Sequence, residues 1–454
     1  MSAVSGEAAI DTLLTVEDAR AAVLAAIAGP TEPETAFLSE ALGRVVAEAV
    51  TSATALPPWD NSAMDGYAIR AADTAGATED GPVRLEVIGE VRAGEPPTIE
   101  LRRGSAVRIA TGAPIPPRAD AVVQVELTTP LDATGAPVGA RGRDATGPLP
   151  AACAVHAAIE PGTAIRRAGS DLGAGVRILD PGDVLTPAAI ALAAGAGVPQ
   201  LFVHARPRVH VLATGDEVRS PNQPLGPAGI PDANGPGLRA LVDAAGGAAY
   251  ALGIAKDRLE DVEGRLRAAL AGGADAIIVS GGVSVGPYDV VKLAFEHIGR
   301  IDLWRVAVQP GKPFAFGVAD RPDGGRTLLF GLPGNPVSSF VTFELFVRPA
   351  IRALAGHRAD RLLRPIDRAV LAEGVSKSHG RRAFIRVVAE RDDNGSPIRD
   401  DRGNVRVGLA GGAQGQGSHV ISALAAAEAL AVVPEAHDTL DAGAEVELWW
   451  LDAG

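Results

Sequence analysis

Cysteine is almost absent from this sequence, because Cys153 is the single cysteine among 454 residues. One cysteine excludes an internal disulfide, and it also excludes a metal site built on a pair of cysteines. Aromatic residues are scarce as well, at 4% of the chain, although apolar residues reach 47%. We therefore predict sizeable cores of small and β-branched side chains, in a protein of the reducing cytoplasm.

Positive charge and long apolar runs are also lacking. The formal net charge is -13, which argues against nucleic acid as a partner. An acidic protein with an anionic substrate has to concentrate its positive charge locally. No run of about 18 uncharged apolar residues occurs, so we expect no membrane-spanning segment. The N-terminus, MSAVSGEAAIDTLL, lacks the basic region and apolar core of a signal peptide.

The most informative stretch is DAIIVSGGVSVGPYD, from Asp275 to Asp289. Residues 276–279 form an apolar, largely β-branched run that is typical of a buried parallel strand. The glycine-rich residues 280–286 allow a sharp turn, and residues 288–298 are predicted to be a helix. A strand, a glycine turn and a helix together aim backbone N–H groups at a phosphate. Asp289 opens that helix, where a carboxylate can hold a cation against the bound anion.

This loop on its own fits three interpretations. It can bind an anion, or its glycines can serve packing alone. It also contains Gly282-Val283-Ser284-Val285-Gly286, which matches the G-x-S-x-G nucleophile elbow of α/β-hydrolases. It is not a Walker A loop, because no Gly-Lys-Ser/Thr follows.

Strand and helix patterns alternate from residue 208 to about 354, which predicts a parallel sheet with right-handed crossovers. We assign residues 207–356 to this central α/β domain. Ligands of such sheets bind beyond the carboxyl ends of the strands. Because Asp216, Asp257, the glycine loop and Lys312 all follow predicted strands, the anion-binding interpretation is favoured.

The preceding sequence predicts an N-terminal domain over residues 10–206, with an inserted β-rich module over 57–160. Residues 56–70, LPPWDNSAMDGYAIR, must form a loop, because two prolines, Asp, Asn and Gly exclude a helix or a central strand. Loops on rigid scaffolds often carry function. The Gly-, Ala- and Pro-rich residues 130–150 are interpreted as a flexible surface insertion.

Two further elements frame these domains. Residues 16–28 are predicted to form a helix capped by Thr15, and its apolar stripe indicates a core or a subunit interface. Residues 361–454 predict a C-terminal β domain, in which Asn394-Gly395 marks a tight turn. A polar loop, GQGSH at 415–419, interrupts that domain.

Together these stretches resemble the molybdopterin molybdenumtransferase family, which includes the E domain of gephyrin. The resemblance covers nearly the whole chain, and the order and spacing of the motifs match. The motifs are PPWDNSAMDGYAIR, RIATGAP, IRRAGSD, LATGDEV, PDANG, SGGVSVGPYD, PGKP, GLPGNPVSS and QGSH.

The resemblance implies the final step of molybdenum-cofactor synthesis. In that step molybdate is inserted into the dithiolene of adenylylated molybdopterin and AMP is released, with Mg²⁺ as the required ion. Adenylylated molybdopterin and molybdate are therefore the expected small-molecule partners. The resemblance also implies an elongated homodimer, with four subdomains per chain and an active cleft shared between subunits.

The resemblance assigns roles residue by residue. Asp257 and Asp289 match acids that handle the metal or the nucleotide, and both are candidate metal ligands. Asp60 and Thr111 match loops that face the cleft of the partner subunit. These four and Lys312 are the candidate catalytic residues. The candidate substrate- and nucleotide-binding residues are Thr214, Gly215, Asp216, Ser280, Gly281, Gly282, Ser284, Pro333, Gly334 and Asn335. The candidate molybdate ligands are Arg305, Lys312, Arg386 and Ser418.

The chain departs from the family pattern in three places. Ser170 stands where the family often has an acid. Gln309 stands where a cleft lysine often precedes PGKP, and Arg305 takes the place of a nearby lysine. The insertion at 130–150 is longer than expected. The remaining cations can still face a dianion such as molybdate.

Two alternatives stay open beside this reaction. A binding protein could keep the fold and lose the chemistry, although the retained Asp257, Asp289 and Lys312 argue against that. A molybdopterin adenylyltransferase would share the central domain, but it would not need the N-terminal and C-terminal modules.

Overall fold

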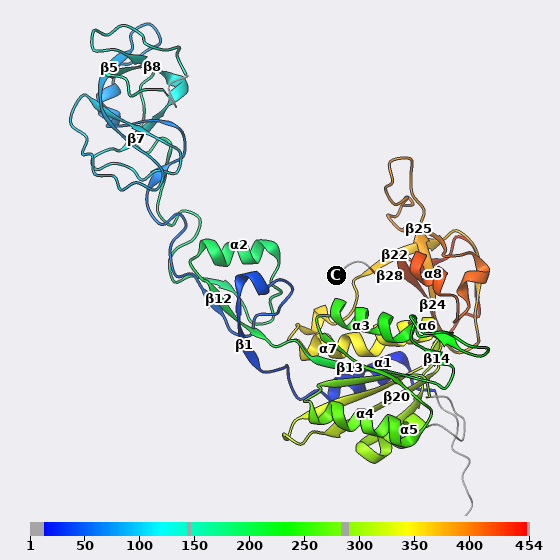
Figure 1. Cartoon of the computed structure of the whole chain (residues 1–454). Helices are drawn as coiled ribbons and strands as arrows, with labels where there is room; N and C mark the ends of the chain where they lie inside the picture. Colours follow the sequence, from blue (N-terminus) through cyan, green and yellow to red (C-terminus); the bar gives the residue numbers. More distant parts are fainter. Residues whose placement is uncertain (1–12, 143–146, 283–289, 452–454) are drawn as a thin grey trace, which may run out of the picture.

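The computed structural model describes residues 13–142, 147–282 and 290–451, and it shows an elongated chain (Figure 1). A β-rich module lies at one end, and a narrow unit of short strands joins it to the central α/β domain. The C-terminal β domain lies against the other side of that central domain. Within the described part of the chain, no helix is both long and apolar enough to cross a membrane.

The central domain is built on a six-stranded sheet in the order β16-β13-β17-β21-β20-β18. Strands β16, β13, β17 and β21 run parallel, whereas β20 and β18 are antiparallel to their neighbours. The strands are β13 (Arg208–Thr214), β16 (Ala248–Ala255), β17 (Ala276–Ser280), β18 (Arg300–Arg305), β20 (Pro313–Asp320) and β21 (Arg326–Leu332). A short parallel ribbon, β14 (Val218–Arg219) with β15 (Ile230–Pro231), lies outside the sheet.

The prediction of a parallel sheet is therefore wrong at the edge formed by β20 and β18. Residues 321–325 connect β20 to β21 directly. Five residues are too few for the crossover that two parallel strands need, so the strands form a hairpin. The parallel part of the sheet is the part that carries the candidate site.

Helices cover both faces of the sheet, as Figure 1 shows. Leu266 and Phe295 belong to the core on one face, and Val242 and Ile351 belong to the core on the other. The helices are α1 (Val16–Ala25), α3 (Asn234–Ala244), α4 (Leu259–Ala271), α5 (Val290–Ile298), α6 (Pro336–Thr342) and α7 (Arg348–Leu354). The central domain is thus a three-layer α/β sandwich.

Helix α1 begins as predicted, because the Thr15 hydroxyl oxygen accepts a hydrogen bond from the Asp18 N–H at 3.0 Å. Its apolar residues Val16, Ala19 and Val23 are fully buried in the core of the central domain. Helix α1, which the sequence assigns to the N-terminal domain, therefore packs on the central domain. Its apolar stripe is buried within the chain by η4 and α7, so that stripe gives no support to a subunit interface.

The helical segment over residues 336–354 is continuous but not uniform. A π-helical segment, η4 (Phe343–Val347), separates α6 from α7. Pro349 follows in the first turn of α7. A proline inside a helix lacks an N–H, and its ring collides with the carbonyl of the residue four positions earlier. The wider turn at η4 relieves that collision.

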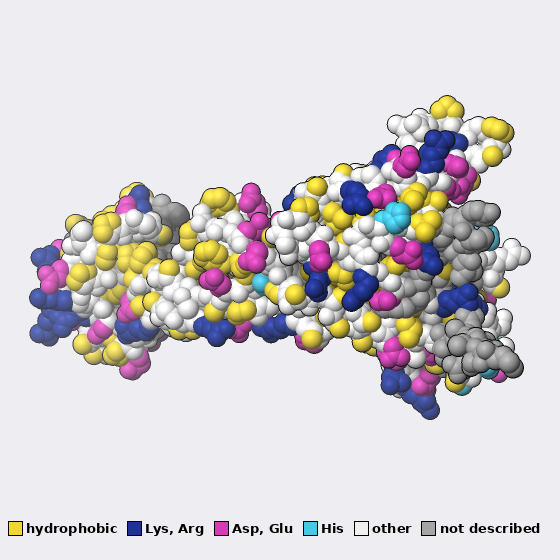
Figure 2. Space-filling model, turned by 90° about the horizontal axis from the view of Figure 1, so that it is seen from below, with side chains coloured by type: hydrophobic (Ala, Val, Ile, Leu, Met, Phe, Trp, Pro, Cys, Tyr) yellow, Lys and Arg dark blue, Asp and Glu magenta, His cyan; other side chains and the backbone are white. Residues whose placement is uncertain are grey.

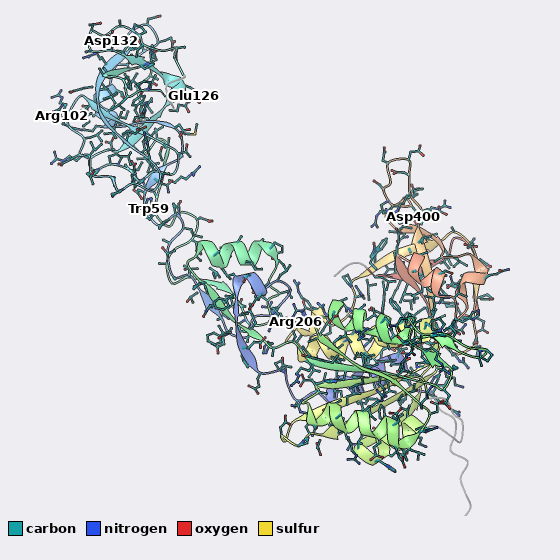
Figure 3. All side chains as sticks on the ribbon, in the orientation of Figure 1. Trp59, Arg102, Glu126, Asp132, Arg206 and Asp400 are labelled. Atoms are coloured by element: carbon teal, nitrogen blue, oxygen red, sulfur yellow. The ribbon has the colours of Figure 1, made fainter. Side chains whose placement is uncertain are left out.

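The module at the far end contains a six-stranded sheet in the order β7-β4-β6-β5-β9-β8. Its strands are β4 (Gly66–Ile69), β5 (Val83–Val91), β6 (Ser105–Ile109), β7 (Ala121–Gln124), β8 (Thr128–Leu131) and β9 (Ala152–Val155), with short helices η2 (Ala71–Thr74) and η3 (Val125–Leu127). Part of the segment predicted to be a flexible insertion is a hydrogen-bonded turn, because the Asp132 carboxylate accepts the N–H groups of Thr134 and Ala136. Asp132 lies at the tip of the module in Figure 3.

Short antiparallel ribbons connect the module to the central domain. They pair β1 (Pro33–Phe37) with β12 (Gln200–His204), β2 (Val50–Thr51) with β11 (Arg177–Leu179), and β3 (Asn61–Ser62) with β10 (Ile165–Arg166). The short helices η1 (Leu38–Glu40) and α2 (Pro187–Gly195) pack beside them. The Thr186 hydroxyl caps α2 by accepting the Ala189 N–H at 3.2 Å.

The C-terminal sheet closes on itself, because β26 pairs with both β24 and β28. Its strands are β22 (Ile366–Leu371), β24 (Arg382–Ala389), β25 (Val405–Leu409), β26 (Ala429–Val433) and β28 (Glu445–Trp450). The smaller elements are β23 (Val375–Ser376), β27 (Thr439–Leu440), η5 (Ala359–Arg361), η6 (Ala413–Gln416) and α8 (Ile421–Ala426). The turn predicted at Asn394-Gly395 is present, because the Asp392 carboxylate accepts the Asn394 N–H at 2.9 Å. A hairpin near the labelled Asp400 projects from this domain (Figure 3).

One strand of this C-terminal sheet comes from the central domain. Between β18 and β20 the chain forms β19 (Val308–Gln309), which pairs with β24 in parallel. Phe384 and Trp449 of the C-terminal sheet also share the core of the central domain, with ring centroids 5.3 Å apart. The PGKP segment that follows β19 therefore lies where the two domains join.

The glycine turn after β17 depends on a conformation that L residues rarely adopt. Gly281 has a φ of +95°, and a Cβ atom there would lie 2.8 Å from both the backbone oxygen and the hydroxyl oxygen of Thr214. Thr214 ends the neighbouring strand β13. Glycine at 281 is therefore what allows the ends of two parallel strands to approach each other.

We expect Gly281→Ala to lower the free energy of unfolding by about 1–3 kcal/mol, through backbone strain and the contact with Thr214. Gly264→Ala is the matched control, because Gly264 lies within α4 with nothing inside 4 Å of its added Cβ. The control should gain about 0.5–1 kcal/mol. Urea denaturation measures both, and changes of the same sign would contradict the strain assigned to position 281.

Candidate active site

A cavity of about 940 Å³ opens beyond the carboxyl ends of the parallel strands β13, β17 and β21. This is the place where ligands of open α/β sheets bind. Most of the predicted substrate-binding residues that the structure describes line it, namely Thr214, Gly215, Ser280, Gly281, Gly282, Pro333, Gly334 and Asn335, and Asp257 lines it as well. Ser284 and Asp289 lie outside the described residues.

Asn234, the first residue of α3, connects three loops of this cavity. Its amide nitrogen donates to the Ser280 hydroxyl oxygen at 2.6 Å and to the Gly334 carbonyl oxygen at 2.7 Å. The PDANG motif served only as a family marker in the sequence, and Asn234 was not among the predicted site residues. A polar residue that opens a helix at the carboxyl edge of a parallel sheet is the signal that could have identified it.

The acidic wall of the larger cavity lacks one predicted residue, Asp216. Glu217 and Asp257 line it, whereas Asp216 does not, although the Asp216 N–H donates to the Asp257 carboxylate at 3.4 Å. Burial, and then the nearby carboxylates of Asp216 and Glu217, raise the pKa of Asp257.

The carboxylate of Asp257 has no ion pair with a described residue, so it is available to a cation. Mg²⁺ prefers one or two carboxylates, together with waters and phosphate oxygens. The donor set at this wall fits such an ion, although no cluster of three acidic, histidine or cysteine side chains suited to a metal occurs in the described ranges.

A second cavity, of about 540 Å³, lies between the PGKP segment and the C-terminal domain. Lys312, Arg386 and Ser418 line it, which brings together three of the four predicted molybdate ligands. The fourth, Arg305, ends β18 and lines neither this cavity nor the larger one. The three lining side chains come from separate loops and strands of two domains, so folding is what brings them together.

Arg386 is the most unusual side chain in this second cavity, because it is only 1% exposed. Its Nη2 group donates to the Gly415 carbonyl oxygen at 2.7 Å, while its buried Nε has no hydrogen-bond partner among the described residues. Burial lowers the pKa of Arg386 to about 10, so the side chain remains cationic at neutral pH. A buried cation with a free donor and no paired carboxylate in the described ranges is suited to an oxyanion.

The two cavities adjoin. Lys312 lines the smaller cavity and its neighbour Pro313 lines the larger one. Likewise, Ser418 lines the smaller cavity and His419 the larger one. The boundary is held by Asn335, whose amide nitrogen donates to the Ser418 hydroxyl oxygen at 3.0 Å. A ligand in one cavity is therefore next to a ligand in the other.

The predicted catalytic residues of the module lie elsewhere. The Asp60 carboxylate accepts the Ala168 N–H at 2.8 Å and pairs with Arg167 at 2.6 Å, and these bonds lower its pKa. The Thr111 hydroxyl donates to Asp65 at 3.0 Å. Asp60 follows Trp59, which marks the junction of the module in Figure 3, far from the central domain. A single chain does not bring Asp60 and Thr111 to the cavities.

These observations define a multidomain α/β protein with two adjoining cavities, one with carboxylates at the strand ends and the other lined by cations. Family models cover most of the chain: the MoeA N-terminal region (domain I and II) matches residues 14–197, a probable molybdopterin binding domain matches 210–353, and the MoeA C-terminal region (domain IV) matches 368–451. The chain therefore belongs to the MoeA family of molybdopterin molybdenumtransferases, as the motifs predicted.

Relatives support this family membership along nearly the whole length of the chain. The chain is 37% identical over 426 residues to molybdopterin molybdenumtransferase 2 of Mycobacterium tuberculosis, covering 92% of this chain and 95% of the relative. It is 34% identical to the molybdopterin molybdenumtransferase of Haemophilus influenzae, covering 96% and 98%. A molybdopterin biosynthesis MoeA protein from Pyrococcus horikoshii has a similar structure, with a TM-score of 0.72, 30% identity, and coverage of 97% of this chain and 99% of that one.

The raised pKa of Asp257 predicts how its replacement changes stability. The folded protein holds this proton more tightly than the unfolded chain, whose aspartate pKa is about 3.9. The wild type therefore loses stability relative to Asp257→Asn as the pH rises from that value through the raised pKa. We expect the variant to be the more stable protein at pH 7 and to differ little near pH 3, by urea denaturation.

Asp261→Asn is the matched control, because the Lys256 N–H and Arg265 lower the pKa of Asp261. A lowered pKa has the opposite effect, so this variant should be less stable than the wild type at pH 7. That difference should disappear as the pH falls through the lowered pKa. Stabilities that shift in the same direction for both variants would refute the electrostatic description of this wall.

Proposed function

We propose that this chain catalyses the molybdenum-insertion step of molybdenum-cofactor biosynthesis. It binds adenylylated molybdopterin and molybdate, transfers the metal to the dithiolene of the pterin, and releases AMP, with Mg²⁺ as the required ion. The observation that carries this proposal is the pair of adjoining cavities, one large and formed by the glycine turns, the other lined by cations. The lone, buried Cys153 suits the reducing cytoplasm as its location.

The larger cavity suits the nucleotide-bearing substrate. The turns at Gly281 and Gly334 line the cavity where the parallel strands end, which is the usual place for a phosphate in such a sheet. The Asp257 carboxylate would hold Mg²⁺, which supplies charge neutralisation at the adenylyl phosphate. The sequence-based assignment of Asp289 to the same ion stays a prediction.

The smaller cavity suits molybdate, which is a tetrahedral dianion. Lys312 and Arg386 supply two positive charges, and the hydroxyl group of Ser418 can donate to a third oxygen. Because Ser418 lies on the boundary with the larger cavity, the oxyanion is held next to the pterin sulfurs. Catalysis then depends on positioning and on fixed charges, without a nucleophilic side chain.

The direct test is to incubate the purified chain with adenylylated molybdopterin, Mg²⁺ and molybdate, and to measure AMP. We expect AMP release that requires molybdate. Lys312→Met should raise the molybdate KM by about a hundredfold, as expected for the loss of one electrostatic element, while the KM for the pterin changes little. Lys312 makes no side-chain hydrogen bond to a described residue, so the variant should fold normally.

Arg391→Met is the control for the loss of a cation from the same half of the chain. Arg391 pairs with Glu428 at the protruding hairpin and lines neither cavity. Its molybdate KM should equal that of the wild type. Wild-type protein that releases no AMP, or AMP release that is independent of molybdate, would overturn the proposed reaction.

We further propose that the functional unit is a homodimer with a shared cleft. Asp60 and Thr111 lie in the module, at the opposite end of the chain from the cavities (Figures 1 and 3). They can serve a cavity only if it belongs to a second copy. The exposed Trp59 and Met64 of the same loop, at 51% and 39%, offer apolar contact area to such a copy.

Mixing two impaired variants, assayed at a molybdate concentration well below the KM of Lys312→Met, tests the shared cleft. Lys312→Met damages the cavity and Thr111→Val damages the module, so each heterodimer retains one intact site and a mixture should recover about a quarter of wild-type activity. A mixture of Lys312→Met and Arg386→Gln carries both defects on the cavity side and should recover none. The shared cleft is rejected if the first mixture also stays inactive, or if sedimentation shows a stable monomer.

A further inference from the structure

The wall of the smaller cavity carries concentrated positive charge. Lys312, Arg381 and Arg386 line it, and no carboxylate of a described residue does. The whole chain has a net charge of -13, and on the face shown in Figure 2 acidic and basic side chains are interspersed along the molecule. A cavity whose charged lining groups are all cations is unusual in so acidic a protein. Two of the three cations are already explained as molybdate ligands, and Arg381 is not.

Arg381 differs from the basic residues beside it in having no partner within the described part of the chain. Arg382 pairs with Glu435 at 3.0 Å and with Glu17. The ammonium group of Lys377 donates to the Glu435 carbonyl oxygen at 3.3 Å. The guanidinium group of Arg381 makes no hydrogen bond or ion pair with any residue in the described ranges, and the residue lies at the cavity wall.

The loop that carries Arg381 is fixed at both ends. Val375 and Ser376 pair with β27, and the Arg382 N–H donates to the Ala307 carbonyl oxygen at 2.8 Å. Between these points the Ser378 N–H donates to the side-chain oxygen of Gln309 at 2.9 Å. Gln309 is the residue that stands where a lysine was expected. Its amide therefore connects the loop to the PGKP segment.

We propose that Arg381 is a third cationic oxyanion-binding residue of this cavity, that Gln309 is its positioning residue, and that the pair sets how readily a tetrahedral dianion is bound. This inference rests on the proposed function. Ser376 and Ser378 of the same loop add hydroxyl donors to the wall. The positive charge absent at position 309 is thus supplied from the loop that Gln309 holds.

Electrostatics give Arg381 a role distinct from that of Arg386. Arg386 is buried and acts on a bound anion at close range. Arg381 is only partly buried, so it can act on an anion that approaches through a field that the acidic protein makes unfavourable. A charge at such a rim changes the association rate and its salt dependence more than it changes the later chemical step.

The test compares Arg381→Gln with the wild type in AMP release, as a function of molybdate and of NaCl. We expect the molybdate KM to rise about tenfold at low ionic strength, with kcat within about twofold of the wild-type value. The KM difference should shrink as NaCl increases, because salt screens exposed charges. Arg381→Lys keeps the charge and should recover most of the loss. A purely structural role for Arg381 would not produce this salt dependence.

Two further variants separate charge from positioning. Gln309→Leu removes the acceptor of the Ser378 N–H without changing charge, and it should raise the molybdate KM in the same direction as Arg381→Gln. Arg382→Gln is the matched control, because this neighbouring arginine is ion-paired and does not line the cavity. It should lower thermal stability and leave the molybdate KM unchanged.

The outcomes distinguish this inference from the proposed function. An active wild type with an unchanged molybdate KM in Arg381→Gln, or a raised KM that does not depend on salt, would overturn the role of Arg381 alone. A wild type that neither releases AMP nor retains molybdate in equilibrium dialysis would overturn the proposed function as well. If Arg381→Gln loses thermal stability, Arg381→Lys separates a role in folding from a role of the charge. A role limited to folding would not restore the molybdate KM at low salt when only the charge is retained.

Discussion

The candidate site depends on one short segment that belongs to two sheets. Residues 306–312 leave the central sheet after β18, pair as β19 with β24 of the C-terminal sheet, and return as β20. A shared core reinforces the junction, and so does the buried carboxylate of Glu344, which accepts two hydrogen bonds from Arg364 at 3.0 and 3.1 Å. Because Lys312 lies in this segment, the smaller cavity exists only while the two domains stay together.

The distribution of charge within the site follows from the same junction. Carboxylates such as Asp257 lie at the strand ends of the central sheet, where a cation and a phosphate can meet. Cations such as Arg386 lie on the C-terminal side, where a dianion can bind away from those carboxylates. The boundary formed by Asn335 and Ser418 keeps the two regions next to each other and chemically distinct. Under the proposed function, this separation of carboxylates from cations lets an acidic protein bind two anionic substrates.

Local sequence rules predicted many elements correctly and failed where packing decided. Strand patterns, the Thr15 cap and the turn at Asn394 needed only neighbouring residues, and the structure confirms them. The direction of β18 and β20 was predicted wrongly, because an alternating pattern does not reveal that a five-residue connection excludes a crossover. Helix α1 packs on the central domain, which its sequence did not reveal, because an apolar stripe indicates burial but does not identify the surface that buries it.

By itself the sequence determined the family, the glycine turns and the side chains with the right chemistry, because motifs and backbone constraints are local properties. The strand-end pattern and the resemblance both pointed to Asp257 and Lys312, whereas Arg386 and Ser418 came from the resemblance alone. Tertiary structure decided which of the candidates meet. It left Arg305 off the cavity walls, added Asn234 and Glu217, and gave Gln309 a partner on a distant loop. Such contacts join residues far apart in the chain, and the pairing of separate strands and domains, which no local pattern encodes, is what brings them together.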